Sequence, residues 1–195
     1  MRLIVATHNP DKVKEFQRIL SPLSVSVETA ELEEVEETGR SFEENAFLKA
    51  EAACRITGLP AVADDSGIAI DALNGEPGIY SARYAGEGAS SSDRNQKLLH
   101  ALQNVPVEKR GARFVCAICC VFPNGDRITA RGECTGTIAF APRGESGFGY
   151  DPLFLVGDRS FGELTAREKD RISHRGRALR DFAEKLNKYE EQLKC

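Results

Sequence analysis

The feature that most restricts the fold is a pair of strand-like runs separated by an Asn-Gly dipeptide. Residues 113–122, RFVCAICCVF, are almost continuously apolar, and residues 127–135 form the second run. Asn124-Gly125 between them predicts a tight type I′ turn, the connection typical of two antiparallel strands. A sheet that contains this hairpin cannot be entirely parallel.

Helical segments alternate with further strand-like runs before the hairpin. Residues 3–6 and 25–28 predict short strands, and the apolar side chains between them recur at helical spacing. Ser41 and Glu44 predict a capping box at the start of a second helix, which Gly58 ends. The segment PAVADDSGIAIDAL that follows predicts a small-residue strand, a polar break at DDSG and a second strand-like run.

The rest of the chain continues this mixture of elements. Ser92 predicts the cap of a helix that carries several leucines, residues 136–142 predict a further strand, and LTAREKDRI predicts a short helix. Ser173 predicts the cap of the C-terminal helix. Because strands and helices intermingle along the whole chain, the sequence predicts an α/β fold with a mixed sheet.

Size and charge narrow the functional classes. A chain of 195 residues is long enough for one well-buried core with two lobes, and no linker or repeat divides it. Its net charge of −4 argues against a general binder of nucleic acids or membrane surfaces. No apolar run approaches the roughly 20 residues that span a bilayer, and the N-terminal run LIVA is too short for a secretion signal. We therefore expect a cytoplasmic protein.

Six cysteines raise the question of disulfides or a metal site. Cys116 and Cys120 share one face of the predicted strand, and Cys119 lies on the other. A zinc or redox site would require a turn here, and a zinc site a second Cys pair at zinc spacing, which the sequence lacks. We interpret the cysteines as buried, reduced thiols.

Polar clusters where predicted elements begin or end indicate the site. The first is THNPDK, between the first strand and the first helix. Asn9 is a good N-cap and Pro10 suits the first helical position, so an ordinary capped turn explains both residues. A helix N-terminus beside a strand end also attracts anions, and Lys12 adds a cation. From these residues alone, a capped turn and a phosphate site are both open.

Adjacent carboxylates form the second cluster. Asp64 and Asp65 follow Ala61-Val62-Ala63, and we expect them where that strand ends, with their side chains on opposite sides. A carboxylate in such a place can bind Mg²⁺ or orient a water molecule. An Asx turn with Gly67 at positive φ is the simpler alternative.

The third cluster precedes and enters the second predicted helix. Glu36 and Glu37 lie just before it, and Asn45 and Lys49, four residues apart, share one of its faces. The acidic run from 28 to 39 also suits a solvated surface. A role for Glu37 and Lys49 therefore depends on whether they lie near the other clusters.

Two further clusters lie in the C-terminal half. The glycines of GFGYDP allow a close approach to a ligand, and Phe148 and Tyr150 offer flat faces to a base. His174 and Arg175 follow Ser173 at a helix N-terminus, where the helix dipole disfavours cations. A plain serine cap explains only Ser173, so an anion or an electron-rich ring is expected nearby. The sequence has no Walker-type phosphate loop and no GxSxG nucleophile motif.

The five clusters together resemble successive motifs of the inosine triphosphate pyrophosphatase family, of the bacterial type that acts on noncanonical purine nucleotides. The matching stretches are ATHNPDKVKEF, EETGRSFEENAFLKA, ADDSGIAIDALNGEPGIYSARYAG, GFGYDPLF and SHRGRAL. They cover nearly the whole chain in order and without large gaps. Each motif is weak alone, but five in register are highly specific.

The resemblance implies a single pyrophosphatase domain over residues 1–195. Its fold would be the α/β, two-lobed, ITPase-like (Maf-like) fold, with an elongated mixed β-sheet and a central nucleotide cleft. The resemblance further implies Mg²⁺ as cofactor, a homodimer, and hydrolysis of dITP, ITP, XTP and dXTP to the monophosphate and pyrophosphate. That activity keeps deaminated purines out of DNA and RNA. The expected partner is a nucleotide, and neither a nucleic acid nor a membrane.

The resemblance also implies a role for each matching residue. Asp65 would accept the proton of the attacking water, and Glu37 and Asp65 would bind Mg²⁺. The expected substrate contacts are Thr7, His8, Asn9, Pro10, Asp11 and Lys12 around the phosphates, Lys49 at the triphosphate, Ser66 as a further contact, Phe148, Gly149, Tyr150 and Asp151 along the nucleoside, and Lys169, His174 and Arg175 at the base. His8 stands where a small residue is common in the family. The pattern leaves Glu36 and Glu37 as alternative metal ligands.

Two other functions fit part of the pattern. A related Maf-like pyrophosphatase would keep the chemistry but act on pyrimidine or modified nucleotides; SHR and GFGYDP argue against it. A non-catalytic nucleotide sensor would bind triphosphates without turnover. The combination of Asp65 with Lys12 and Lys49 argues against it, because pure binding requires no general base.

Overall fold

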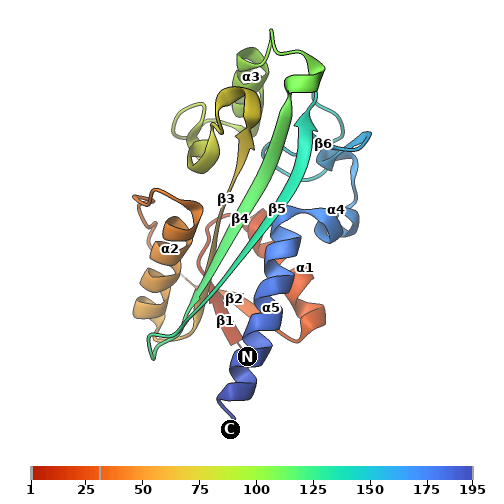
Figure 1. Cartoon of the computed structure of the whole chain (residues 1–195). Coiled ribbons are helices and arrows are strands. Elements are labelled where there is room, and N and C mark those ends of the chain that lie inside the picture. Colours follow the sequence, from red (N-terminus) through yellow and green to blue (C-terminus); the bar gives the residue numbers. More distant parts are fainter. Residues whose placement is uncertain (1, 31, 195) are drawn as a thin grey trace. The chain divides into compact units, whose positions relative to one another are not determined.

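The strands form one mixed sheet in the computed structural model, which describes residues 2–30 and 32–194 (Figure 1). Within these residues the sheet has seven strands in the order β2-β1-β3-β4-β5-β6-β7. The strands are β1 (Arg2–Val5), β2 (Ser26–Thr29), β3 (Ala61–Ile70), β4 (Gly111–Val121), β5 (Arg127–Ile138), β6 (Phe154–Val156) and β7 (Arg159–Ser160). Strand β1 pairs in parallel with β2 and β3, whereas β6 pairs antiparallel with β5 and β7. The predicted α/β class and mixed sheet are confirmed.

The helices follow the order that the sequence predicts. They are α1 (Pro10–Leu20), α2 (Phe42–Thr57), α3 (Ser91–Ala101), α4 (Ala166–Ile172) and α5 (His174–Gln192). Ser41 caps α2 by accepting a hydrogen bond from the Glu44 amide, and Gly58 ends the helix at a φ of 66°. None of the described helices has both the length and the apolar character that crossing a membrane requires.

The chain divides into two compact units. The first contains Met1–Asp65, Cys116–Gly132 and His174–Cys195, and the second contains Ser66–Val115 and Glu133–Ser173. Strands β3, β4 and β5 each contribute residues to both units.

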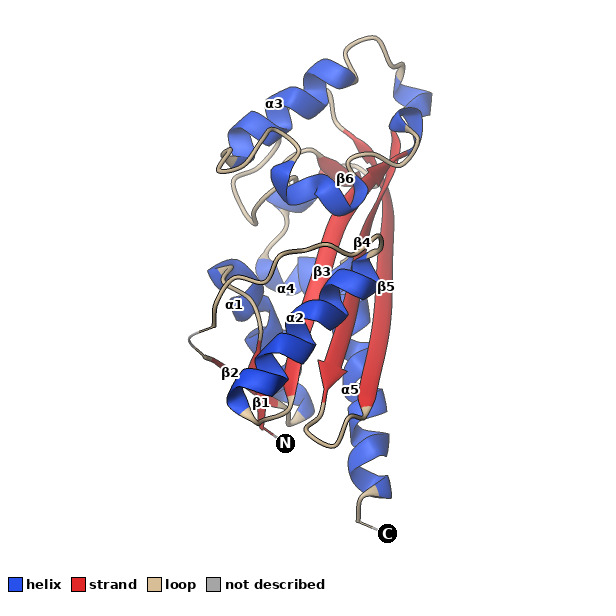
Figure 2. Ribbon diagram, turned by 90° about the vertical axis from the view of Figure 1, so that its left-hand side faces the viewer, coloured by secondary structure: helices blue, strands red, loops and turns tan. Residues whose placement is uncertain are grey.

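In the first unit, helices cover both faces of the sheet (Figure 1). Because side chains alternate along a strand, Ile4 and Ala63 pack against the α2 side, whereas Leu3 and Val62 pack against α1 and α5. Figure 2 shows α2 lying along its face of the strands. Small residues on α2, among them Ala46, Ala50 and Ala53, face alanines of β3 in the same cluster, and they let this helix lie close to the sheet.

The second unit has a core of its own. Ile68, Ile70, Leu98 and Leu102 are fully buried there. Three phenylalanine rings contact one another in the same cluster, Phe114, Phe154 and Phe161, with centroid separations of 4.6 to 5.9 Å. Aromatic burial of this kind stabilises a compact core.

Strand β3 corrects the predicted break at DDSG. The strand runs without interruption through Asp64 and Asp65, and Gly67 does not have a positive φ, so no Asx turn forms there. The neighbouring strand β1, however, ends at Val5, opposite Val62. The two aspartates therefore lie just beyond the carboxyl end of β1 rather than of their own strand.

The β4–β5 hairpin forms, but its predicted type I′ turn is wrong. The Gly125 amide donates to the Phe122 carbonyl at 2.9 Å, so Pro123 and Asn124 are the central residues of the turn. Proline fixes φ near −65° and favours a type I turn, and only Gly125 of the Asn-Gly pair has a positive φ. Gly125 then supplies the left-handed residue that follows a type I turn in longer hairpin loops.

Two other element boundaries differ from prediction. Helix α3 is capped by Ser90 instead of Ser92, because Ser90 forms a reciprocal capping box with Asp93. The further strand predicted at 136–142 is wrong: residues 136–138 continue β5, which ends at Ile138, and residues 139–142 are not a strand. There the buried Arg110 guanidinium donates hydrogen bonds to the carbonyl oxygens of Ile138 and Ala139, at 2.9 and 3.0 Å.

The cysteines in the described residues form no disulfide bonds and are buried, as interpreted. They are Cys54, Cys116, Cys119, Cys120 and Cys134. Burial raises the pKa of the Cys119 thiol to about 11, which keeps it protonated and unreactive. Cys195 lies outside the described residues.

Candidate active site

Asp64 and Asp65 have different partners on the two sides of β3. Both carboxylates are buried, with residue exposures of 1% and 5%. Asp64 meets Lys12 and Arg175, whereas Asp65 meets Asn45 and Lys49. The alternation of side chains along a strand explains this separation, and it gives adjacent residues two different tasks.

Asp64 is the centre of a buried ion network. Its Oδ2 accepts from Arg175 Nη2 at 2.8 Å and Nε at 3.2 Å, and Lys12 Nζ lies 3.2 Å from the same oxygen. Arg175 also donates to Glu15 Oε2 at 2.6 Å. Burial alone would raise the pKa of the Asp64 carboxyl, but the charges of Arg175 and Lys12 bring it well below its usual range. Asp64 is therefore a permanent anion.

Arg175 is almost inaccessible at the start of α5. Burial opposes its charge, but Asp64 and Glu15 raise the pKa of the guanidinium well above its usual value. Gly132 of β5 makes this position possible, since a Cβ there would lie 2.2 Å from the His174 carbonyl oxygen and 2.6 Å from the Ala178 nitrogen. The first turn of α5 thus rests directly on the strand, and His174 is buried beside Arg175.

The THNPDK turn is held by its own side chains. Asn9 Oδ1 accepts from the amides of Asp11 and Lys12 at 2.9 and 3.3 Å, and Thr7 Oγ1 accepts from the Asn9 amide at 3.2 Å. Pro10 is the first helical residue. His8 contacts the Leu32 carbonyl oxygen through Nε2 at 2.8 Å. Capping therefore explains Thr7, Asn9 and Pro10, but it does not explain the Lys12 side chain, which reaches Asp64.

Asp65 lies beside a second carboxylate and a lysine. Lys49 Nζ is 2.6 Å from Glu37 Oε1 and 3.7 Å from Asp65 Oδ1, so one ammonium faces both acids. Burial raises the pKa of Asp65 and the charge of Glu37 raises it further, whereas Lys49 lowers it; the net direction is upward. The Lys49 pKa rises as well, because the surrounding carboxylates outweigh its burial.

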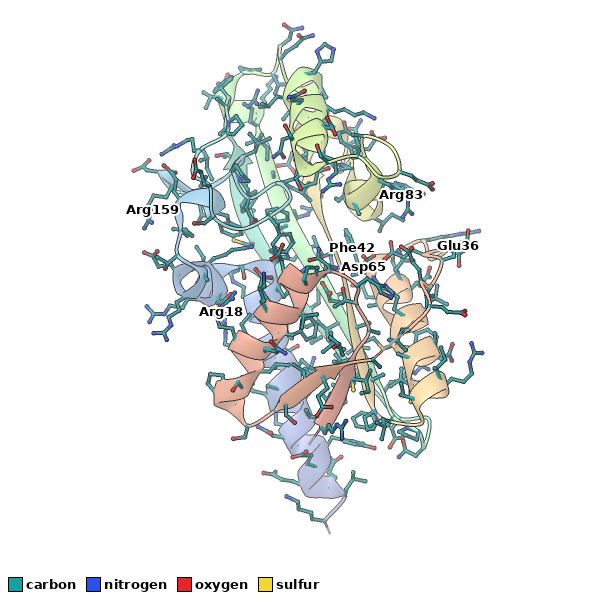
Figure 3. The ribbon with its side chains drawn as sticks, turned by 180° about the vertical axis from the view of Figure 1, so that it is seen from behind. Arg18, Glu36, Phe42, Asp65, Arg83 and Arg159 are labelled. Atoms are coloured by element: carbon teal, nitrogen blue, oxygen red, sulfur yellow. The ribbon has the colours of Figure 1, made fainter. Side chains whose placement is uncertain are left out.

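The structure separates the two glutamates that the sequence leaves as alternatives. Glu37 is partly buried and paired with Lys49, whereas Glu36 is exposed. Figure 3 shows Glu36 on the outer side of the loop before α2, whereas Asp65 is buried. This placement favours Glu37 as the partner of Asp65. Ser66, the next residue of β3, is half-buried and begins the second unit.

The second unit brings GFGYDP and α4 together. Lys169 Nζ lies 2.6 Å from Asp151 Oδ2 and 4.6 Å from the centre of the Phe148 ring. The same Asp151 oxygen accepts from the Phe148 amide at 2.8 Å. A Cβ at Gly147, whose φ is 77°, would meet this oxygen at 2.1 Å, so glycine is required there. The pair fixes the loop and leaves Phe148 half-buried.

The other two residues of this loop are fixed by the second unit itself. Tyr150 is buried in its core and donates through its hydroxyl to the Ser81 carbonyl oxygen at 2.9 Å. The Gly149 carbonyl oxygen accepts from Asn95 Nδ2 at 3.2 Å. The roles of Phe148 through Asp151 at a nucleoside stay predictions.

Sequence reasoning assigned no role to three residues that the site uses. Asp64 was recognisable as the neighbour of Asp65, and Asn45 by its spacing of four from Lys49. Glu15 had one signal: a charged residue four positions before Ile19, on the apolar face of α1. All three are buried.

The donor set of the Asp65 cluster suits a hard divalent cation. Two carboxylates, Glu37 and Asp65, already face one cation, the ammonium of Lys49. In residues 2–30 and 32–194 no group of three or more His, Cys, Asp and Glu side chains could hold a metal alone. Mg²⁺ differs from other metals here, since it is commonly bound through one or two carboxylates together with substrate phosphates and water. The residues therefore fit a hard divalent cation that takes its remaining ligands from phosphate oxygens and water.

Comparison with known proteins gives matches over nearly the whole chain. The model of the Ham1 family matches residues 3–185. A dITP/XTP pyrophosphatase of Geobacter sulfurreducens is 51% identical over 184 residues, which are 91% of this chain and 92% of the relative. The dITP/XTP pyrophosphatase of Bacillus subtilis is 49% identical over 189 residues, 94% of this chain and 96% of the relative. The solved structure of a HAM1 protein from Coxiella burnetii superimposes with a TM-score of 0.87 at 41% identity, covering 96% of this chain and 99% of that one.

Proposed function

We propose, from the premise that this chain belongs to the Ham1 family, that it hydrolyses deaminated purine nucleoside triphosphates to the monophosphate and pyrophosphate. Its substrates are dITP, ITP, XTP and dXTP. The observation that carries the proposal is the cluster of Asp65, Glu37 and Lys49, in which a buried and a partly buried carboxylate each have an oxygen within 3.7 Å of the Lys49 ammonium. Hydrolysis of a phosphoanhydride requires this combination of base, metal ligands and cation.

Charge neutralisation is the first task of the site, because a triphosphate repels an attacking water. Lys49 lies beside Asp65, and Lys12 lies beside Asp64. Stabilisation of negative charge on the leaving pyrophosphate by such fixed cations is often the largest contribution to catalysis. Thr7 through Lys12 surround the phosphates in this proposal, with Asn9 holding the turn in shape.

Asp65 is the acceptor of the water's proton. A positioned general base contributes about 10²–10⁴-fold to rate. Glu37 and Asp65 would hold Mg²⁺, which would supply acidified water and draw charge from the phosphates. Lys49, which contacts Glu37 and faces Asp65, would pair with the triphosphate.

We assign recognition of the base to the start of α5 and to the GFGYDP loop with its partner Lys169. Hypoxanthine and xanthine carry a carbonyl oxygen at position 6, where adenine carries an amino group. Donors such as Lys169 or backbone N–H groups suit the carbonyl and leave the adenine amino group without an acceptor, whereas the guanidinium of Arg175 is buried against Asp64 and Glu15. A mismatch among buried polar groups can discriminate by about 10⁴-fold or more. His174, Phe148, Gly149, Tyr150 and Asp151 complete the proposed nucleoside contacts, and Ser66 adds a substrate contact.

The proposal extends to the state of the protein in the cell. We propose a single domain that acts as a cytoplasmic homodimer on free nucleotides, without direct contact to nucleic acid. The net charge of −4 supports the last point, since nucleic-acid binders carry a basic surface. Sedimentation equilibrium at micromolar protein tests the dimer directly, and a monomer at these concentrations would contradict it.

The deciding experiment measures pyrophosphate and orthophosphate separately. Wild-type protein is incubated with Mg²⁺ and, in turn, ITP, dITP, XTP, GTP, ATP, dTTP and UTP. We expect pyrophosphate chiefly from ITP, dITP and XTP. Turnover confined to pyrimidine nucleotides would instead indicate a Maf-like enzyme. Orthophosphate as the only product would refute the bond assignment, and tight binding without turnover would indicate a sensor.

A further inference from the structure

Asn45 is a fully buried polar residue that the reaction as described does not use. It lies in the first turn of α2, on the same face as Lys49, and its exposed fraction is 0%. A buried amide must find hydrogen-bond partners, because burying it without them is unfavourable. Its two partners are therefore informative about its role.

Both partners of Asn45 belong to the active-site cluster. Its Oδ1 accepts from the Gly39 amide at 2.8 Å, and its Nδ2 donates to Asp65 Oδ2 at 3.0 Å. A backbone N–H can only donate, so the oxygen of Asn45 must face Gly39. The NH₂ group then has to face Asp65. The orientation of the side chain is thus fixed by chemistry as well as by distance.

The hydrogen bond to Asp65 gives the two oxygens of that carboxylate different partners. Oδ2 is occupied by Asn45, whereas Oδ1 is the oxygen that lies 3.7 Å from Lys49. A carboxylate held at one oxygen cannot rotate freely, so the other oxygen keeps a fixed direction. A general base needs this, because proton transfer requires hydrogen-bond distance and alignment.

The hydrogen bond to Gly39 fixes the acidic loop. Gly39 lies two residues after Glu37, and a Cβ at this position would meet Asn45 Oδ1 at 2.6 Å and Glu44 Cβ at 2.7 Å. The loop therefore approaches α2 as closely as a glycine allows. Asn45 ties this loop to the strand that carries Asp65, through one rigid amide.

We propose that Asn45 is a positioning residue for the reaction, which sets the direction of the Asp65 carboxylate and anchors the loop of Glu37. The inference rests on the proposed function. Asn45 itself touches neither the water nor the substrate. Removal of such a partner, which orients a metal ligand or base, lowers activity by about 10–100-fold.

Two substitutions separate the two hydrogen bonds. Asn45→Ala removes both, and Asn45→Asp keeps the acceptor for Gly39 but replaces the donor with a carboxylate that repels Asp65. Asn187 of α5 is exposed, so Asn187→Ala and Asn187→Asp are matched controls. The first readout is hydrogen exchange of the Gly39 amide in metal-free, nucleotide-free protein. The second is kcat and KM for dITP with Mg²⁺.

We expect faster exchange of the Gly39 amide in Asn45→Ala and protected exchange in Asn45→Asp. Both variants lose kcat by about 10-fold or more, while KM changes far less, because the lost contact acts on the base and not on the substrate. If Asn45 had a role in packing alone, the isosteric Asn45→Asp would keep the wild-type kcat. Asn45→Asp also tests the positioning role if Asn45→Ala does not fold. The Asn187 variants keep wild-type values.

The outcomes distinguish the inference from the function on which it rests. Failure of the wild-type protein to release pyrophosphate from dITP would refute the proposed function. Wild-type release together with undiminished kcat in Asn45→Asp would refute only the positioning role. Unchanged Gly39 exchange in Asn45→Ala would refute the anchoring of the loop.

Discussion

Replacing Asp64 by asparagine removes the anion on which the buried network of the first unit depends. The substitution preserves the shape of the side chain but leaves Lys12 and Arg175 without their shared partner. Arg175 has an exposed fraction of only 1%, so water cannot take the place of the carboxylate. We predict a large loss of stability with an otherwise unchanged fold.

The size of the loss follows from burial and from the one partner that stays. Removing one member of a buried ion pair costs about 3–5 kcal/mol, because it leaves an uncompensated charge. Glu15 still contacts Arg175 at 2.6 Å, and Lys12 keeps some access to water with 16% of its side chain exposed. Both facts place the expected loss at the lower end, at about 3 kcal/mol.

Urea unfolding followed by circular dichroism measures this loss at pH 7. The midpoint should fall while the slope stays unchanged, since the surface exposed on unfolding is the same. Asp181→Asn is the control: Asp181 pairs with Lys185 at 2.8 Å on the exposed face of α5, and such pairs contribute about 0.5 kcal/mol. Equal, small losses in both variants would refute the argument from burial.

The pH dependence gives an independent check of the sign. The pKa of Asp64 is lower in the folded protein than in the unfolded chain. Its stabilisation is therefore fully present above the unfolded pKa, which is about 4, and is lost as the pH falls through the folded value. The difference between wild type and Asp64→Asn should be constant from neutral pH to about pH 5 and should shrink in stronger acid. A difference that grew in acid would contradict it.

Three further predictions concern other parts of the first unit. Gly132→Ala should lower the unfolding free energy by about 3 kcal/mol or more, measured by urea denaturation, because its Cβ would meet the His174 carbonyl oxygen at 2.2 Å; wild-type stability would show that α5 can move away. Cys116 and Cys120 should resist alkylation by iodoacetamide at pH 8 in the native protein and react in urea, because burial raises the pKa of both thiols. Peptide mass mapping measures the labelling, and rapid labelling of the native protein would contradict their burial. Lys12→Ala should weaken binding of ITP more than binding of inosine, measured by calorimetry, and an equal loss for both would exclude a phosphate contact.

Sequence patterns predicted the elements of this fold well where local chemistry decides them. Ser41 and Gly58 bound α2 as expected, and the apolar run with Cys116 is a strand buried on both faces. The predicted type I′ turn at Asn124-Gly125 was wrong because Pro123, one residue earlier, occupies the first central position of the turn. A neighbouring proline outweighed the dipeptide signal.

Long-range partners are what the sequence could not supply. The two aspartates suggested a strand end, yet β3 continues, because Lys12, Arg175 and Asn45 satisfy carboxylates that would otherwise not tolerate the interior of a sheet. Arg175 is 111 positions from Asp64 in the chain. No local pattern encodes such a pair, although the succession of motifs did identify the family.

The choice between Glu36 and Glu37 illustrates the same limit. Both lie in an acidic run without periodicity, and only the approach of α2 decides which one meets Lys49. That approach depends in turn on Gly39 and Asn45, which close the loop against the helix. Tertiary contacts, not composition, distinguish the two glutamates.

The most direct test of the account is pyrophosphate release from dITP by Asp65→Asn, measured beside wild type with Mg²⁺ present. The account predicts that the variant folds normally and that its turnover falls by about 10²-fold or more, because the base is gone while the shape of the site stays. Its unfolding midpoint should remain close to that of the wild type, in contrast to Asp64→Asn. Near-wild-type release of pyrophosphate by Asp65→Asn would contradict the central assignment.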